Sequence, residues 1–189
     1  QGSLAFIQES WKFQMPSNGE LVSLFAMYLG NERLLFLASL PFTLLAVLAV
    51  HALARRLSAS RENALLAALG FGTLPIVLYN TFNLAVDMFA AAFFLASSAL
   101  LLAAFQPSPR AGGRSGLLAG AAGLAFGLGL GARYIYVPLL LLMTGLCGLV
   151  SLRGVALRLA DWKRAGLSAA TFALGSLAPS LFWYARNLR

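Results

Sequence analysis

The 189-residue chain is 60% hydrophobic and only 11% charged, with a mean hydropathy of +0.80. This composition excludes an ordinary soluble domain and predicts an integral membrane protein. The formal net charge of +8 does not indicate nucleic-acid binding, because in a membrane chain the distribution of basic residues among the loops matters more than their sum. The single cysteine, Cys147, lies inside an apolar run, so no disulfide framework is expected.

Residues 1–30 mix aromatic and charged side chains, and a Pro-Ser-Asn-Gly turn at 16–19 divides them. They contain no apolar run long enough to cross a bilayer. We therefore expect an extracytoplasmic interfacial segment made of two short helices.

Six apolar segments follow, and they predict an all-α fold, a polytopic membrane bundle of about six transmembrane helices. A polar turn with a Ser cap precedes the second segment, and Pro75 should bend the outer end of that segment. The fourth segment has glycines at four-residue spacing between Gly116 and Gly131, so one helix face should let another helix approach closely. The predicted spans are residues 34–54, 63–79 and 84–105, a fourth from 116, then 135–152 and, after a basic loop at 153–164, 165–184.

Basic residues divide unequally between the two predicted faces of this bundle, with nine on one face and five on the other. The positive-inside rule makes the face with nine cytoplasmic. The opposite face then holds four of the six acidic residues, so we expect polar chemistry outside. His51 lies at the cytoplasmic end, where a structural role is expected. The nine cytoplasmic basic residues are Arg55, Arg56, Arg61, Arg110, Arg114, Arg153, Arg158, Lys163 and Arg164.

Asp87 is the carboxylate around which the polar face is organised. It follows the polar stretch that ends at Asn83 and lies roughly 6 Å inside the mouth of the third predicted helix. An ionisable group in a membrane-length apolar run normally faces a partner or a water-filled cavity. Two interpretations follow: Asp87 lines a functional site, or it is the structural partner of a nearby Arg.

Soluble-type hydrolase, zinc and nucleotide mechanisms have no support, because the sequence contains no HExxH, GxSxG or Walker-type motif and no Cys/His metal spacing. The usable groups are carboxylates, arginines, amides and aromatic rings. Carboxylates near phosphate-binding arginines suit transfer from a lipid-linked phosphate donor at the outer membrane surface. The same groups also suit a transporter, or a set of helix-anchoring ion pairs.

Five stretches, in order over essentially the whole chain, resemble the GT-C membrane glycosyltransferases, in particular the protein O-mannosyltransferase and aminoarabinose-transferase clan. MPSNGELVSLF (15–25) is similar to the end of that clan's first large extracytoplasmic loop, and ARRLSASR (54–61) to the cytoplasmic turn after it. NLAVDMFAAAFF (83–94) resembles the helix start whose Asp faces the active-site cavity. GLAFGLGLGAR (123–133) resembles the Gly-rich helix that ends in a basic residue, and FWYARN (182–187) the Trp-Tyr-x-Arg-Asn stretch.

The resemblance implies inverting transfer of a sugar from a polyprenyl-phosphate donor to a lipid, glycan or protein acceptor. It implies a multi-pass protein of the plasma (bacterial inner) membrane, surrounded by membrane lipids, with its active face extracytoplasmic. No nucleic-acid partner is expected, and a divalent metal is the one cofactor that the carboxylates leave open.

Residue by residue, the resemblance places Asp87 in the cavity wall, where it would bind sugar, acceptor or a cation. Arg133 or Arg186 would contact the donor phosphate, because a guanidinium fork matches phosphate oxygens. Glu20 would lie at the cavity rim, and Asn83 belongs to the same polar end. For Arg186 an interfacial anchor beside Trp183-Tyr184 is the equal alternative.

The chain departs from the clan's pattern in two places. The clan's catalytic base is an Asp in the first extracytoplasmic loop, whereas this chain has no Asp before Asp87, and Arg133 stands where the clan commonly has Lys. We therefore expect the base to lie upstream of residue 1, and residues 1–189 to be a single transmembrane domain within a larger one that transfers no sugar alone. Two other functions stay open: a multipass transporter or flippase, and a non-catalytic module that packs a partner through the Gly-rich helix.

Overall fold

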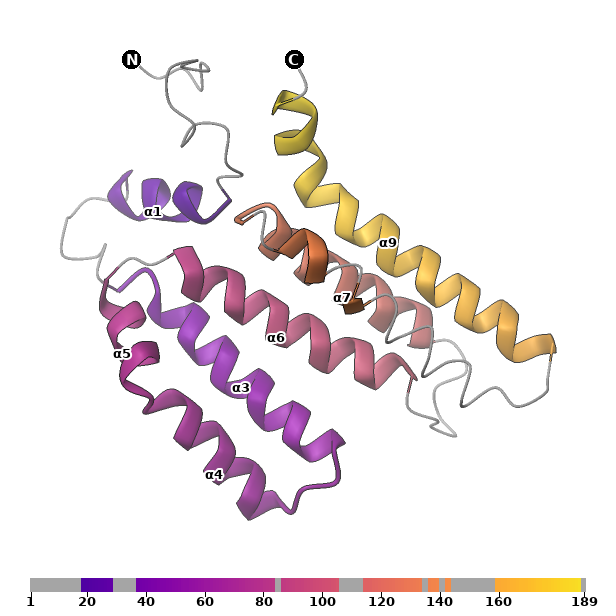
Figure 1. Ribbon diagram of the computed structural model, residues 1–189, viewed down its shortest axis with the longest axis horizontal. Helices are drawn as coiled ribbons and strands as arrows, with labels where there is room; N and C mark the ends of the chain where they lie inside the picture. Colours follow the sequence, from indigo (N-terminus) through magenta and orange to yellow (C-terminus); the bar gives the residue numbers. More distant parts are fainter. Residues whose placement is uncertain are drawn as a thin grey trace.

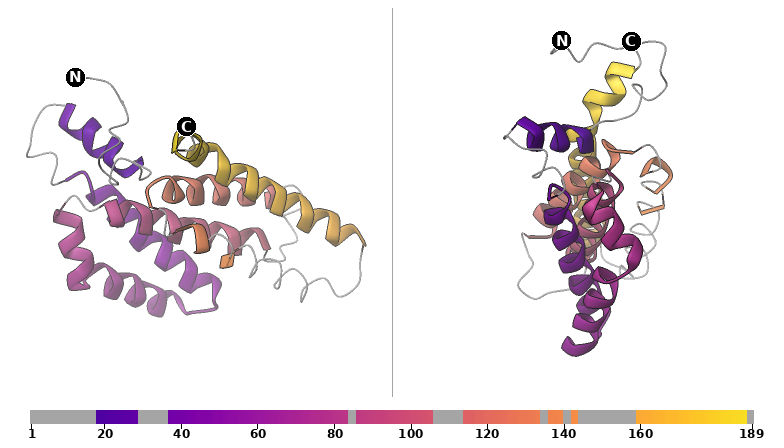
Figure 2. Two further views of the ribbon diagram at one scale, coloured as in Figure 1. Left: turned by 45° about the horizontal axis from the view of Figure 1, so that its top comes forward. Right: turned by 90° about the vertical axis from the view of Figure 1, so that its left-hand side faces the viewer.

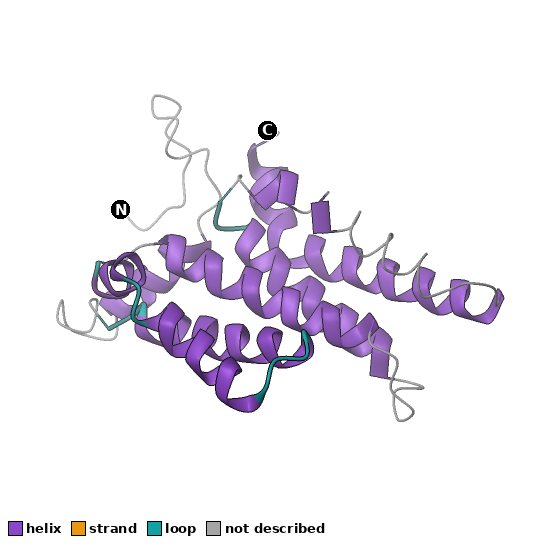
Figure 3. Cartoon of the chain, turned by 60° about the horizontal axis from the view of Figure 1, so that its bottom comes forward, coloured by secondary structure: helices purple, strands orange, loops and turns teal. Residues whose placement is uncertain are grey.

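A computed structural model describes residues 18–28, 37–83, 86–105, 114–133, 136–139, 142–143 and 159–187. Within these ranges the regular structure is entirely helical, which confirms the all-α prediction (Figure 3). The helices are α1 (Asn18–Tyr28), α3 (Leu40–Arg56), α4 (Arg61–Gly72), α5 (Pro75–Phe82), α6 (Val86–Phe105), α7 (Arg114–Leu130) and α9 (Leu159–Asn187).

The long helices lie side by side in one row, in the order α4, α3, α6, α7 and α9 (Figure 1). Seen edge-on, the row is narrow and α1 lies crosswise at one end of it (Figure 2). That end, which we call the α1 end, contains the starts of α3 and α6 and the ends of α5, α7 and α9. A single row leaves broad apolar faces uncovered, and leucines such as Leu48 and Leu174 are 65% and 69% exposed. Faces of this kind match a hydrocarbon surrounding better than water.

Two of the described helices are long and apolar enough to cross a membrane: α6, and residues 166–186 of α9. The pair α4 and α5 adds a third if the two helices are counted as one bent span. The six predicted spans are thus supported in part. α3 and α7 have 17 residues each, about 26 Å of helix against a hydrocarbon core of roughly 30 Å, and residues 34–36 and most of 135–152 lie outside the described ranges.

The second predicted span is bent where Pro75 was expected to bend it. α4 and α5 meet at 57°, and Pro75 stands in the first turn of α5, where its missing N–H costs nothing. The Ser cap is also confirmed, since the Ser60 side chain accepts a hydrogen bond from the Asn63 backbone N–H at 3.1 Å. A buried hydroxyl pair, Thr43 and Thr81 at 2.8 Å, ties α5 to α3.

The predicted basic loop at 153–164 is wrong in its second half, because α9 already begins at Leu159. Residues 159–164 contain neither Gly nor Pro, so nothing stops the helix from extending beyond its apolar part. Residues 153–158 lie outside the described ranges.

The glycine face of α7 packs against α9, as the four-residue spacing predicts. A Cβ at Gly123 would collide with the Phe172 carbonyl of α9, and one at Gly127 would lie 2.6 Å from Cγ of Pro179. The contact is made by the middle and the end of α7, whereas a Cβ at Gly116 would meet nothing within 4 Å in the described structure. Close backbone approach therefore fixes the two helices, and with them the two helix ends that carry Arg133 and Arg186.

Candidate functional site at the α1 end

An ion pair joins the first turn of α6 to the end of α7. Arg133 Nε lies 3.0 Å from Asp87 Oδ1, although the N–H is not aligned for a hydrogen bond. The Arg133 side chain is 35% exposed and the Asp87 side chain 66% exposed, so water and solutes reach the carboxylate. Asp87 thus has an Arg partner, as one of the two interpretations expects, and it is also accessible in the first turn of α6, while its place in a functional site stays a prediction.

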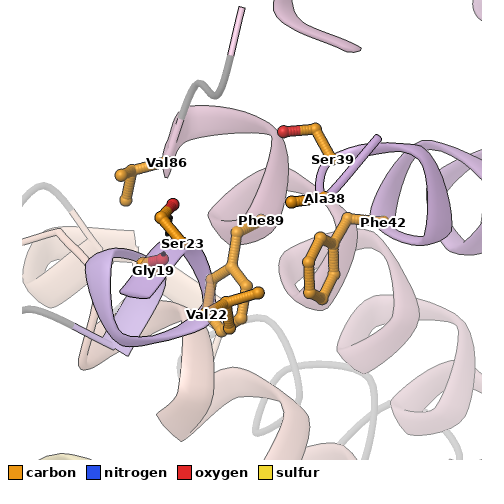
Figure 4. Close-up of a pocket in the computed structure, with 8 residues that line it drawn as sticks. All are labelled: Gly19, Val22, Ser23, Ala38, Ser39, Phe42, Val86 and Phe89. Carbon is orange, nitrogen blue, oxygen red and sulfur yellow. Dashed lines mark hydrogen bonds between the residues drawn. The ribbon is translucent and has the colours of Figure 1, made fainter. Parts of the chain in front are cut away.

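A shallow groove lies at the same end of the molecule, between α1 and the starts of α3 and α6, and neither residue of the pair lines it (Figure 4). Its interior is about 10 Å³, room for roughly one water molecule, and it is open to solvent. Val86 and Phe89, which flank the pair's carboxylate in sequence, form one wall. The lining is mostly apolar, with two hydroxyl groups: Gly19, Val22, Ser23, Ala38, Ser39, Phe42, Val86 and Phe89.

Aromatic rings hold the groove's walls in place. Phe42 of α3 packs edge-on against Phe89 of α6, with ring centroids 4.8 Å apart, and Phe89 lies at the same distance from Phe93. Such tilted contacts add to the apolar area that the rings bury. At Gly19 a Cβ would collide with Val86, so α1 lies directly against the start of α6.

The remaining predicted site residues lie near this end in other settings. Glu20 is exposed in the first turn of α1. The Asn83 amide donates to the Tyr79 carbonyl at 3.0 Å, where it caps its own helix α5. Arg186 lies over the Trp183 ring at 5.3 Å, the position expected of an anchor beside that aromatic residue. Of the five predicted site residues, Asp87 and Arg133 are thus the two that the structure brings into contact.

Asn18 is the residue at this end that the sequence did not single out. Its backbone N–H donates to the Gly131 carbonyl at 2.9 Å, and its side-chain amide donates to Leu128 O at 3.3 Å and Pro179 O at 3.5 Å. Its carbonyl oxygen accepts from Trp183 Nε1 at 2.6 Å. An Asn before a Gly is ordinarily a turn signal, and nothing in that local pattern points to partners more than a hundred residues away.

A divalent metal stays a prediction. Across the part of the chain that the structure describes, no three His, Cys, Asp or Glu side chains gather into a set that could hold one. Asp87 contributes one carboxylate, and its described partner is a cation.

Comparison with known proteins adds no relative: no family model, curated protein or solved structure matches the chain.

Proposed function

We propose that the chain is the donor-binding part of a membrane glycosyltransferase of the GT-C type, which uses a polyprenyl-phosphate sugar at the extracytoplasmic face. The observation that carries the proposal is the contact of Asp87, at the start of the membrane-length helix α6, with Arg133 just after α7, at the end of the molecule that also holds a shallow apolar groove. The motif of the cavity carboxylate, Asp87, and the motif of the phosphate-binding arginine, Arg133, are distant in sequence, yet the two side chains are in contact.

The chemistry of the pair suits a lipid phosphate. A guanidinium binds phosphate oxygens through charge-assisted hydrogen bonds, and a half-buried one does so with less competition from water. The groove itself is too small to hold a lipid chain, but its apolar side chains Phe42, Val86 and Phe89 offer a surface against which the first part of a chain could lie. Asp87 would then lose one contact to Arg133 and accept hydrogen bonds from a sugar hydroxyl, so the ion pair opens when donor binds.

General-base catalysis is a separate requirement, because the acceptor needs a carboxylate within hydrogen-bond reach of its nucleophile. Among the described acidic residues Asp87 is engaged with Arg133, and Glu20 lies on another helix. We therefore assign these 189 residues to binding of the donor and assign no residue to catalysis.

One feature favours a second function. The 57° break between α4 and α5 makes a discontinuous helix, which is typical of the substrate sites of secondary transporters. The break lies away from the Asp87–Arg133 pair, and its Thr73 hydroxyl donates to carbonyls of α4 at 2.9 and 3.2 Å. Because of this discontinuous helix, a transporter is the alternative function.

The test is equilibrium binding of a panel of polyprenyl-phosphate sugars to the purified protein in lipid nanodiscs. Arg133→Gln should weaken binding about tenfold, the effect of losing one charge-assisted contact. Arg61→Gln is the matched control, because Arg61 is an exposed arginine at the start of α4, at the far end of the row. Equal affinities for wild type and Arg133→Gln, or solute uptake by proteoliposomes, would remove the proposal.

A further inference from the structure

At the end of α7, two of the last four helix carbonyls, and that of Gly131 just after the helix, accept hydrogen bonds from residues of other helices. A helix leaves its last four carbonyls without partners inside the helix. Here Leu128 O accepts from the Asn18 side chain, Leu130 O from the Tyr184 hydroxyl at 3.5 Å, and Gly131 O from the Asn18 backbone. α1 and α9 therefore cap α7 together.

Asn18 makes two of these three contacts, and its side-chain amide donates to two carbonyl oxygens. An Asn side chain has two N–H donors and one carbonyl acceptor. The two donor contacts go to α7 and α9, and the acceptor contact goes to the indole of Trp183, which is 2% exposed. Gly131 leaves the room for this arrangement, since a Cβ there would collide with the Asn18 amide.

Arg133 follows this capped turn immediately. Its backbone N–H donates to Gly129 O at 3.2 Å, so the turn between Leu128 and Gly131 sets where its Cα lies. Because Asn18 binds that turn on both sides, the position of the guanidinium relative to Asp87 depends on Asn18. Arg133 and Asn18 form no hydrogen bond or ion pair with each other, so the influence of Asn18 acts through the end of α7.

We infer that Asn18 is a positioning residue for Arg133, which holds the end of α7 so that the guanidinium is placed to bind a phosphate group. This inference rests on the proposed function, because it takes phosphate as the ligand of Arg133. Asn18 touches no ligand in this scheme. Its hydrogen bonds join α1 to α7 and α9.

The experiment measures binding of farnesyl phosphate, with farnesol as the probe that lacks phosphate, to the 189-residue protein in nanodiscs. Asn18→Ala should weaken farnesyl phosphate binding about tenfold and leave farnesol binding unchanged. In an Arg133→Gln background the same change should have no further effect, because Asn18 acts through Arg133. Asn63→Ala, which removes an exposed amide at the start of α4, is the control and should bind like wild type.

A second variant and a spectroscopic signal separate positioning from loss of fold. With Trp11 and Trp162 replaced by Phe, the ultraviolet resonance Raman band that reports hydrogen bonding at the indole N–H comes from Trp183 alone. Asn18→Asp should keep this band, since a carboxylate still accepts from the indole, but should lose phosphate affinity, since it cannot donate to Leu128 O. Asn18→Ala should shift the band.

The outcomes distinguish the two proposals. If Arg133→Gln binds farnesyl phosphate as well as wild type, the proposed function fails. If Arg133→Gln weakens binding but Asn18→Ala either leaves it unchanged or weakens it equally in both backgrounds, the proposed function stands and the positioning role of Asn18 is wrong.

Discussion

At the scale of single residues, the contact between Asp87 and Arg133 decides how the α1 end is interpreted. If the ion pair is structural, it stabilises the fold. If the two side chains bind the donor, they need to separate from each other. The exposure of the two side chains favours opening, because solvent screening reduces the worth of such a pair to about 0–1 kcal/mol.

A double-mutant cycle with Asp87→Asn and Arg133→Gln measures this directly. Chemical unfolding of the four proteins in detergent should give a coupling energy below about 1 kcal/mol. A coupling above about 3 kcal/mol, the range found when a buried pair is broken, would make the pair a structural element and leave the site without its charges.

The sequence predicts part of this residue-level picture. Asp87 was expected to face either an Arg or a cavity, because an unpaired carboxylate at a helix mouth is costly. Which Arg it meets depends on how α6 and α7 pack, and no local pattern contains that information. Asn18 shows the same limit more strongly, since its partners belong to α7 and α9.

At the scale of helices, close packing of α7 on α9 sets the geometry of the α1 end. Gly127 lies against the Ser176 carbonyl and Pro179, so Gly127→Ala should force the helices apart and destabilise the protein by about 1–3 kcal/mol. Gly116→Ala is the matched control, because a Cβ there meets nothing within 4 Å in the described structure and Ala favours helix over Gly.

Thermal unfolding in detergent of these two variants gives the comparison. A large loss at Gly127 with no loss at Gly116 is the expected result. Equal stability of both variants would mean that the small-residue face is not what holds the two helices together.

Some sequence signals are sufficient to predict where the helices lie and bend, and others are not. The third predicted span is a helix long and apolar enough to cross a membrane, and the Pro75 bend is confirmed, because apolar length and proline act locally. The predicted start of α9 is wrong, since charged residues after an apolar run suggest a loop, whereas Lys163 and Arg164 also favour helix.

At the scale of the whole molecule, the helices form a row whose order differs from the chain order. α3 lies between α4 and α6, so the start of α3 meets the start of α6 and forms the groove with α1 (Figure 1). Apolar segments in a sequence predict the helices but do not predict which helices lie next to each other. The groove depends on α3 lying next to α6, so the sequence could not predict it. The row also keeps Arg55, Arg56 and Arg61 at the end opposite the α1 end.

The most direct test of the central claim, that the α1 end holds a lipid phosphate, is site-specific photo-crosslinking. A photoreactive amino acid at Ser23, in the groove, and another at Leu66, an exposed position on α4, are compared in nanodiscs that contain a labelled polyprenyl phosphate. We predict labelling at position 23 that excess unlabelled polyprenyl phosphate suppresses and polyprenol does not. Equal labelling at position 66, or labelling at 23 that polyprenol suppresses equally well, would contradict a phosphate site at this end.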